Sequence, residues 1–179
     1  MTHIELFRRI DDHFLREQSL VRVRSFLNSQ RQVEGWFKGE LILFLSTLHQ
    51  QNELTGWRSE YRTPEIGERR IDFQVLLDDG PLYFEIKSFY HGRQGAVMVD
   101  LATCLTFLPN DIGKLSLLEN GNKFCLVFLT PRPDPERWQN ALQRFRRNFP
   151  CLAEVRTRDE FPEEMYIAKL EVTPCGNGG

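Results

Sequence analysis

The sequence has few of the features that mark secreted, membrane-spanning or zinc-binding proteins. Its four cysteines are widely spaced without a C-x-x-C pair, which argues against a zinc or iron–sulfur site and against a disulfide framework. The four histidines are equally scattered, so no metal-binding histidine pair stands out. No stretch approaches the ~20 apolar residues that cross a bilayer, and the N-terminus does not resemble a secretion signal. We therefore expect a cytoplasmic protein without a membrane partner.

The sequence also lacks low-complexity tracts, internal repeats and a strong net charge. Its 179 residues suit one domain, residues 1–179, with a sizeable core. A formal net charge of −2 does not by itself indicate nucleic-acid binding. Arginine nevertheless supplies 18 of the 23 basic residues, and arginine is the better bidentate partner of phosphate. A local basic surface on a nearly neutral protein is therefore compatible with a nucleic-acid partner.

Two strands joined by a tight turn are predicted for residues 69–90. Apolar and polar side chains alternate in residues 70–77 and again in residues 82–88, which is the period of a strand with two unlike faces. The connection contains Gly80, which can supply the positive φ that a hairpin turn requires.

The pairing of these strands determines which charged side chains meet. If residues 78–81 all belong to the connection, the apolar residues share one face, Asp72 lies opposite Lys87, and Gln74 lies opposite Glu85. An odd-numbered connection would mix apolar and charged side chains on both faces, which a half-buried sheet resists. The apolar pattern therefore predicts that two carboxylates and one ammonium group converge.

Paired carboxylates and a lysine suit metal-dependent phosphodiester hydrolysis. Asp72 and Glu85 offer the hard oxygen ligands that Mg²⁺ or Mn²⁺ prefers. Lys87 can hold or help to deprotonate a metal-bound water and can stabilise charge on a phosphoryl group. The alternative is a solvated sheet face with one cross-strand ion pair, worth well under ~1 kcal/mol when exposed.

The order of these residues resembles the PD-(D/E)XK nuclease superfamily. An Asp, a short hairpin and then Glu-Ile-Lys follow a helix that carries an acidic residue, and the matching residues are Asp72, Glu85, Lys87 and Glu40. Ile71 stands where the name of the motif has proline.

The resemblance implies a set of roles. Asp72, Glu85 and the backbone carbonyl of Ile86 would bind Mg²⁺, with Mn²⁺ as a substitute, and Glu40 would be an accessory ligand. Lys87 would act on the attacking water, and in-line hydrolysis would leave a 5′-phosphate. The resemblance favours DNA over RNA as the substrate.

Glu40 lies at the margin of the apolar stripe of its helix. It is next to Leu41 and one turn before Phe44, so we expect it to be held against the sheet within reach of the metal. Glu34, by contrast, is expected on the open face. The alternative for Glu40 is a solvent-facing side chain near the start of the helix.

Three further basic residues are candidates for nucleic-acid contacts. Arg69 and Arg70 precede the hairpin and would form part of a basic rim. Lys114 lies in a D-x-x-K-L segment similar to a basic position on the helix that follows the catalytic strand in several branches of the superfamily. Lys114 could equally be a surface lysine. A chain with one site would need to form a homodimer to cut both strands together.

The predicted fold class is α/β, with a central mixed β-sheet, helices on both faces and an α-β-β-β-α-β core that resembles restriction endonucleases. Residues 1–32 are expected as an N-terminal helical addition, 33–130 as the nuclease-like core, 131–174 as a C-terminal helix with edge strands, and 175–179 as a disordered tail. Expected helices cover residues 3–17, 20–27, 33–51, 110–119 and 135–148, and expected strands cover 56–62, 123–130, 151–156 and 165–172. Residues 97–107 are ambiguous between strand and helix.

Two rival functions remain open at the level of sequence. One is a non-catalytic nucleic-acid-binding or regulatory protein on the same fold, because a fold does not fix a function. The complete set of Asp72, Glu85 and Lys87 argues against this, since loss of activity would typically remove at least one of them. The other is a structural domain whose hairpin charges are merely solvated.

Overall fold

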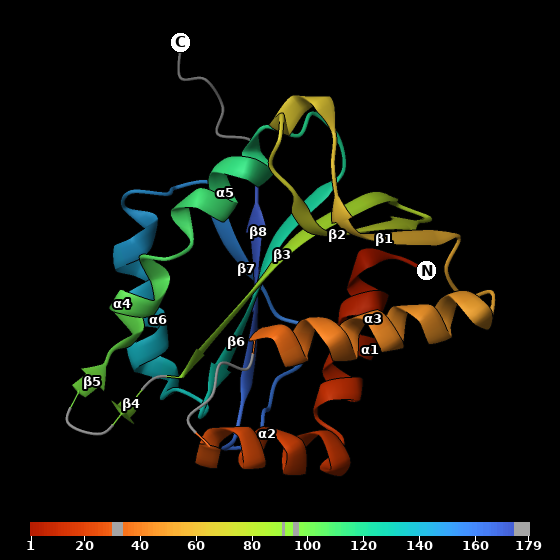
Figure 1. Cartoon of the computed structure of the whole chain (residues 1–179). Coiled ribbons are helices and arrows are strands. Elements are labelled where there is room, and N and C mark those ends of the chain that lie inside the picture. The colour runs from red at the N-terminus through yellow and green to blue at the C-terminus, as the bar shows by residue number, and fades with distance from the viewer. Residues whose placement is uncertain (30–33, 91, 95–96, 174–179) are drawn as a thin grey trace.

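The computed structural model describes residues 1–29, 34–90, 92–94 and 97–173, and it contains a six-stranded mixed sheet with helices on both faces (Figure 1). The expected tail at 175–179 lies outside the described residues. No helix within these ranges is long and apolar enough to cross a membrane. The elements are α1 (His3–Phe14), α2 (Glu17–Ser29), α3 (Glu34–Gln50), β1 (Gly56–Tyr61), the short helix η1 (Pro64–Ile66), β2 (Ile71–Leu77), β3 (Gly80–Tyr90), β4 (Gly92–Gln94), β5 (Val97–Val99), α4 (Leu101–Leu105), α5 (Pro109–Ser116), β6 (Asn122–Thr130), α6 (Pro135–Arg146), β7 (Leu152–Val155) and β8 (Tyr166–Val172).

The sheet has the strand order β1-β2-β3-β6-β8-β7. Strands β1, β2 and β3 form an antiparallel meander, β3 runs parallel to β6, and β8 is antiparallel to both β6 and β7. The crossover from β3 to β6 holds α4, α5 and the small β4–β5 sheet. The prediction of a mixed α/β sheet is confirmed. The expectation that both C-terminal strands are edge strands is wrong for β8, because β7 pairs along its outer side.

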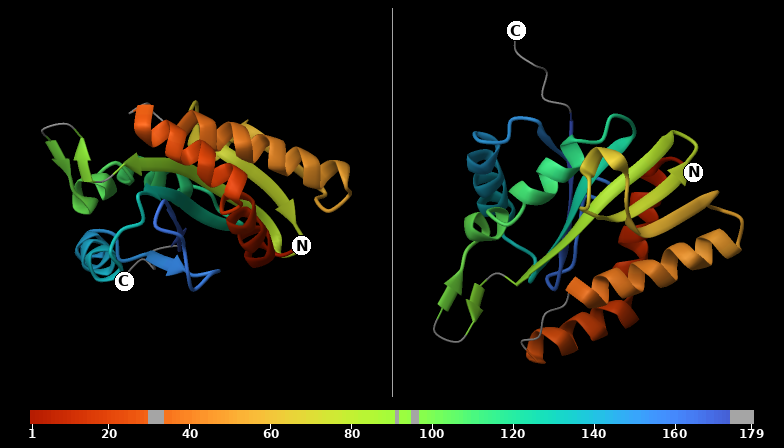
Figure 2. Two further views of the ribbon diagram at one scale, coloured as in Figure 1. Left: turned by 90° about the horizontal axis from the view of Figure 1, so that it is seen from below. Right: turned by 45° about the horizontal axis from the view of Figure 1, so that its top comes forward.

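Helices cover both faces of the sheet, as the turned views show (Figure 2). On one face, α1 to α3 pack aromatic side chains against the strands, and the rings of Phe37 and Phe128 stack with centroids 4.0 Å apart. On the other face, α4 to α6 bury a second apolar cluster that includes Val127 and Trp138. The unbroken apolar run of β6 contributes side chains to the apolar clusters on both faces of the sheet, because successive side chains of a strand point to opposite faces.

The hairpin turn is shorter than predicted. Leu77 pairs with Gly80 and Phe73 with Phe84, so the connection comprises two residues rather than four. Gly80 takes the positive φ, 106°, that favours glycine. Both lengths are even, so the apolar residues still share a face. The pairing of Asp72 with Lys87 is nevertheless wrong, because every pair is shifted by two positions.

Candidate active site

The candidate site begins where strands β2 and β3 part. Their pairing ends at Phe73 and Phe84, and one further pair would set Asp72 beside Glu85. At this point Oδ2 of Asp72 accepts a hydrogen bond of 2.8 Å from the backbone N–H of Ile86. The side chain of Asp72 thus takes the place of a backbone carbonyl. We call this point, formed by Asp72, Glu85 and Ile86, the β2–β3 fork.

Helix α3 brings a lysine and a glutamate to the fork. Lys38 Nζ donates a 2.8 Å hydrogen bond to Oδ1 of Asp72 and lies 3.1 Å from Oε1 of Glu34. Glu34 and Lys38 are four residues apart, which places them on the same face of the helix. Both oxygens of Asp72 are therefore engaged, one by the backbone of β3 and one by α3.

Helix α5 covers Glu85 from the opposite face of the sheet. Lys114 Nζ lies 2.5 Å from Glu85 Oε1 and 3.0 Å from Asp111 Oδ1. Lys87 Nζ lies 3.3 Å from Asp111 Oδ2 and 4.0 Å from Glu34 Oε1, so it links the residues of α3 to those of α5. The resulting carboxylate–lysine cluster comprises Glu34, Lys38, Asp72, Glu85, Lys87, Asp111 and Lys114.

The cluster contains more carboxylates than lysines. Glu85 is 2% exposed and Asp111 is 5% exposed. Oε1 of Glu85 and Oδ2 of Asp111 are completely buried and accept no hydrogen bond of regular geometry, although a lysine lies near each. With every group ionised, the four carboxylates exceed the three ammonium groups by one negative charge. The cluster would be balanced by one more proton or by a bound cation.

The pKa of Glu85 reflects this excess. Burial, and then the charge of Asp72, raise the pKa of the Glu85 carboxyl to about 8, even though Lys114 acts in the opposite direction. Burial lowers the pKa of Lys38, but hydrogen bonds to Asp72 and Glu34 outweigh it, so the pKa is raised overall. Lys38 therefore stays charged near neutral pH, whereas Glu85 can hold a proton there.

Most of the predicted site residues meet in this cluster. Asp72, Glu85 and Lys87 come together, although the hairpin pairing differs from the predicted one. Lys114 joins them and also donates a 3.2 Å hydrogen bond to the backbone carbonyl of Arg70. Since the side chain of Lys114 is 17% exposed, it is not the simple surface lysine that the sequence also allowed.

The two predicted rim arginines lie outside the cluster. Arg69 and Arg70 are both exposed. The guanidinium of Arg70 lies 3.3 Å from Oε2 of Glu60 on β1. Arg70 therefore borders the cluster through its backbone rather than through its charge.

Glu40 does not reach the fork, contrary to the prediction. Its carboxylate lies 2.5 Å from Nη1 of Arg22 and 3.5 Å from Nε2 of His13, and so it joins α3 to α1 and α2. Glu34, expected on the open face, is the acidic residue of α3 that joins the cluster. Six residues separate the two glutamates, which at 3.6 residues per turn places them on different faces of the helix.

Besides Glu34, two residues of the cluster, Lys38 and Asp111, were not predicted from the sequence. Lys38 could have been found from its i, i+4 spacing to Glu34. Asp111 resembles a helix cap in the sequence, but α5 begins at Pro109 and Leu108 holds the capping position. Asp111 therefore lies within the first turn, where its side chain points into the cluster beside Lys114.

The fork has a donor set that fits a hard divalent cation. Within the described residues, no group of three or more His, Cys, Asp or Glu side chains is arranged as a metal site. Asp72 and Glu85 instead offer two carboxylates. The N–H of Ile86 points towards β2, and the C=O of a strand residue points to the same side as its N–H, so that carbonyl also faces the fork. Two carboxylates and a carbonyl suit Mg²⁺, which usually keeps several water ligands.

Comparisons with protein-family models, with curated proteins and with solved structures found no match to this chain. A function is therefore inferred from the residues and from their geometry. These establish an α/β mixed sheet and a carboxylate–lysine cluster at the fork between two of its strands.

Proposed function

We propose that the chain is a Mg²⁺-dependent nuclease with a restriction-endonuclease-like fold, which hydrolyses phosphodiester bonds of DNA and accepts Mn²⁺ as a substitute. The observation that carries the proposal is the meeting of Asp72 and Glu85 at the β2–β3 fork, with Lys87 joined to the same cluster. Buried carboxylates in excess of their lysines are the electrostatic condition that favours a cation.

Asp72, Glu85 and the carbonyl of Ile86 would hold the ion. Bound there, Mg²⁺ would lower the pKa of a water molecule and stabilise charge on the phosphoryl group. Binding requires Glu85 to release its proton, because the ligand is the carboxylate form. Lys38 would leave Oδ1 of Asp72 and retain Glu34, 3.1 Å away, as its partner.

The remaining residues of the cluster would position the attacking water and stabilise the charge on the phosphate. Asp111 lies within 3.3 Å of both Lys87 and Lys114, so it fixes the two ammonium groups beside the fork. Lys87 would orient the attacking water, and Lys114 would contact the phosphate. Arg69 and Arg70, both exposed, would hold the nucleic-acid backbone at the rim. Glu40 has no part in this arrangement.

A non-catalytic nucleic-acid-binding protein is the second candidate. Both carboxylate oxygens of Asp72 already accept hydrogen bonds from the protein, one from Lys38 and one from the backbone N–H of Ile86. This favours the second candidate, and a purely structural network would show the same hydrogen bonds. As a nuclease, the chain would cut both strands of a duplex together only as a homodimer, because the described residues of each copy form one such cluster.

Cleavage of a substrate panel tests the proposal. The panel holds supercoiled, linear, single-stranded and branched DNA together with RNA, each with Mg²⁺ or Mn²⁺. We expect Asp72→Asn and Lys87→Met to lower the cleavage rate at least ~10³-fold, equivalent to about 4 kcal/mol of transition-state stabilisation. Glu40→Gln is the matched control and should cleave like the wild type.

Thermal unfolding with and without Mn²⁺ separates metal binding from catalysis. An ion that binds the folded state raises the melting temperature, and Asp72→Asn should abolish that rise. A rise without cleavage of any substrate would favour the non-catalytic candidate. Neither a rise nor cleavage would overturn the proposal and leave a structural network.

A further inference from the structure

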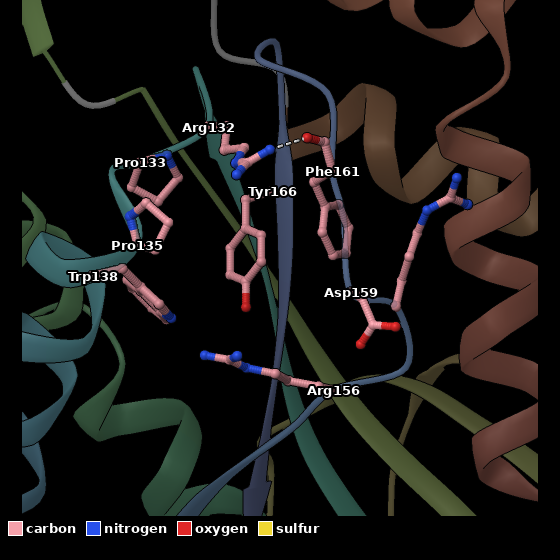
Figure 3. A pocket seen from close by; sticks show the side chains of 9 residues that line it. Arg132, Pro133, Pro135, Trp138, Arg156, Asp159, Phe161 and Tyr166 are labelled. Carbon is pink, nitrogen blue, oxygen red and sulfur yellow. Dashed lines mark hydrogen bonds between the residues drawn. The ribbon is translucent and has the colours of Figure 1, made fainter.

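A second site lies beyond β6, at the outer part of the sheet. A pocket that is partly open to solvent is formed by the start of α6, strand β8 and the segment that joins β7 to β8 (Figure 3). None of its lining residues belongs to the carboxylate–lysine cluster. Its lining combines aromatic rings with arginines, chiefly Arg132, Pro135, Trp138, Arg156, Phe161 and Tyr166.

The aromatic floor of the pocket is held rigidly. The ring of Tyr166 is flanked by Trp138, with centroids 6.0 Å apart, and by Phe161, with centroids 4.7 Å apart. The Tyr166 hydroxyl and the Trp138 indole N–H both donate to Oε1 of Glu154, at 2.8 and 2.7 Å. Because these hydrogen bonds fix both rings, the pocket presents a preformed flat surface.

Two arginines lie at opposite ends of the Tyr166 ring (Figure 3). Arg132 donates to the carbonyl of Phe161, and it takes part in no ion pair within the described part of the chain. Arg156 is exposed, and its contact to the Glu154 carboxylate is long, at 3.9 Å. Both guanidinium groups therefore retain donors for an anion.

The other two charged residues of the lining are less available or of opposite sign. Arg158 lies 3.1 Å from Oδ1 of Asp12 and donates to the carbonyl of Glu160. Asp159 is the one carboxylate among the described lining residues, and it lies beside Phe161 in Figure 3. It would repel a phosphate nearby but would accept a hydrogen bond from an amino or hydroxyl group.

We propose that this pocket binds one nucleotide of a single-stranded nucleic acid. The base would stack on Tyr166, and the phosphates on its two sides would contact Arg132 and Arg156. A nucleotide within a strand has a phosphate on each side of its base, whereas a free monophosphate has one, so two separated arginines fit the strand better. Aromatic stacking with a basic track is the usual means of binding single strands.

The pocket lies near the carboxylate–lysine cluster. Lys87 pairs with Val127 on β6 and Tyr166 pairs with Leu129 on the same strand, so both side chains point to the face that α4 to α6 cover. Two strand spacings across the sheet and two residues along it separate their backbones by about 12 Å. Binding nevertheless needs no cleavage, so this site goes beyond the proposed function and can be tested without it.

Fluorescence anisotropy of a labelled 12-nucleotide single strand tests the site. The Asp72→Asn chain in EDTA serves as the background, so that cleavage cannot interfere. We expect Arg132→Gln and Arg156→Gln each to weaken binding about tenfold and to reduce the slope of log K against log[salt] by about 0.7. Arg147→Gln is the matched control, because Arg147 is exposed at the far end of α6, about 18 Å along that helix.

Substitution of Tyr166 tests the stacking surface. Tyr166→Leu should weaken binding about tenfold, whereas Tyr166→Phe, which keeps the ring, should bind like the background chain. The exposed arginine variants keep the test valid if Tyr166→Leu unfolds. Unchanged binding by both arginine variants would overturn the proposal.

Competitors distinguish the possible sources of the nucleotide. A nucleoside 3′,5′-bisphosphate should displace the strand at a lower concentration than a nucleoside 5′-monophosphate, and inorganic phosphate should displace it least. Equal competition by the monophosphate would overturn the assignment to a strand in favour of a free nucleotide. Equal competition by inorganic phosphate or by polyglutamate would reduce the site to a general anion contact. The two proposals can fail separately. If the wild type cleaves no substrate while Arg132→Gln and Arg156→Gln still weaken strand binding, the proposed nuclease is refuted and the proposed binding site is supported.

Discussion

Within the described part of the chain, buried carboxylates and lysines contact each other in two places, and the two arrangements differ. In the first, Lys169 Nζ lies 2.5 Å from Oδ1 of Asp11, and the hydroxyl of Thr157 donates to Oδ2. Both charged residues are 1% exposed, and Lys169 lies 5.2 Å from the centroid of the Phe161 ring. This pair joins α1 to β8 with one acid, one base and both carboxylate oxygens satisfied.

The carboxylate–lysine cluster differs in balance and in access. Its carboxylates outnumber its lysines, two of its buried oxygens lack a regular hydrogen bond, and its lysines are partly exposed. A balanced, closed pair can only hold the fold together. An unbalanced cluster that solvent reaches can exchange one cation for another, which is the property that a metal-dependent site needs.

The largest expected effect is on the closed pair. Asp11→Ala leaves Lys169 buried without its counter-charge, so the free energy of unfolding should fall by about 3–5 kcal/mol. Urea denaturation measures this. The double variant Asp11→Leu with Lys169→Met removes both charges and should recover most of the loss. A loss below about 1 kcal/mol in Asp11→Ala would show that the pair is not closed.

The cluster should respond to pH through Glu85. Its pKa in the folded state, about 8, is above its ordinary value of 4.5, so its proton stabilises the folded state. That contribution is complete below about pH 4.5 and is lost as the pH rises through about 8. Between pH 5 and 8.5 in EDTA, the wild type should lose up to about 4 kcal/mol of stability relative to Glu85→Gln. Parallel profiles of the two proteins in urea titrations would contradict this.

Exchange of cations can be tested at Lys38. Its ammonium occupies Oδ1 of Asp72 at 2.8 Å, so Lys38→Met should increase the affinity for Mn²⁺ about tenfold, equivalent to ~1.4 kcal/mol. Arg70→Met, which removes a nearby positive charge that contacts Glu60 instead, is the control for long-range electrostatics. Equal gains in a Mn²⁺ titration of both variants would argue against direct competition.

The smallest effect is expected at Glu40. Glu40→Gln removes partly exposed ion pairs with Arg22 and His13, so the stability should change by less than about 1 kcal/mol. The cleavage rate should stay within about twofold of the wild type. A loss comparable to that of Asp72→Asn would restore Glu40 to the site.

The elements that the sequence predicts correctly are those that one local pattern determines. Apolar and polar residues alternate in β2 and β3, as expected for strands with two unlike faces. The residues of β6 are almost all apolar, as expected for a strand that is buried on both faces. The length of the turn escaped prediction, since connections of two and of four residues both keep Phe73 on the apolar face. The apolar pattern determines only that the connection has an even number of residues. The turn residues determine which even number it is, and so they set the register.

The rest of the cluster depends on how distant elements pack. Whether Glu34 or Glu40 faces the sheet is decided by the rotation of α3 about its axis. That rotation follows from the docking of Leu41, Leu45 and other α3 residues against the sheet and α1. Asp111 likewise reaches Lys87 only because α5 lies over β3 and β6. No spacing in the sequence encodes these contacts.

The hydrogen bond from Ile86 to Asp72 makes one backbone position a natural reporter. The carboxylate of Asp72 faces α3 with one oxygen and the next strand with the other. Any change of partner at Oδ1 alters the charge on Oδ2, and so it alters the magnetic environment of the Ile86 amide proton. In an isotope-labelled sample, that single resonance would therefore register the occupancy of the fork without a substrate.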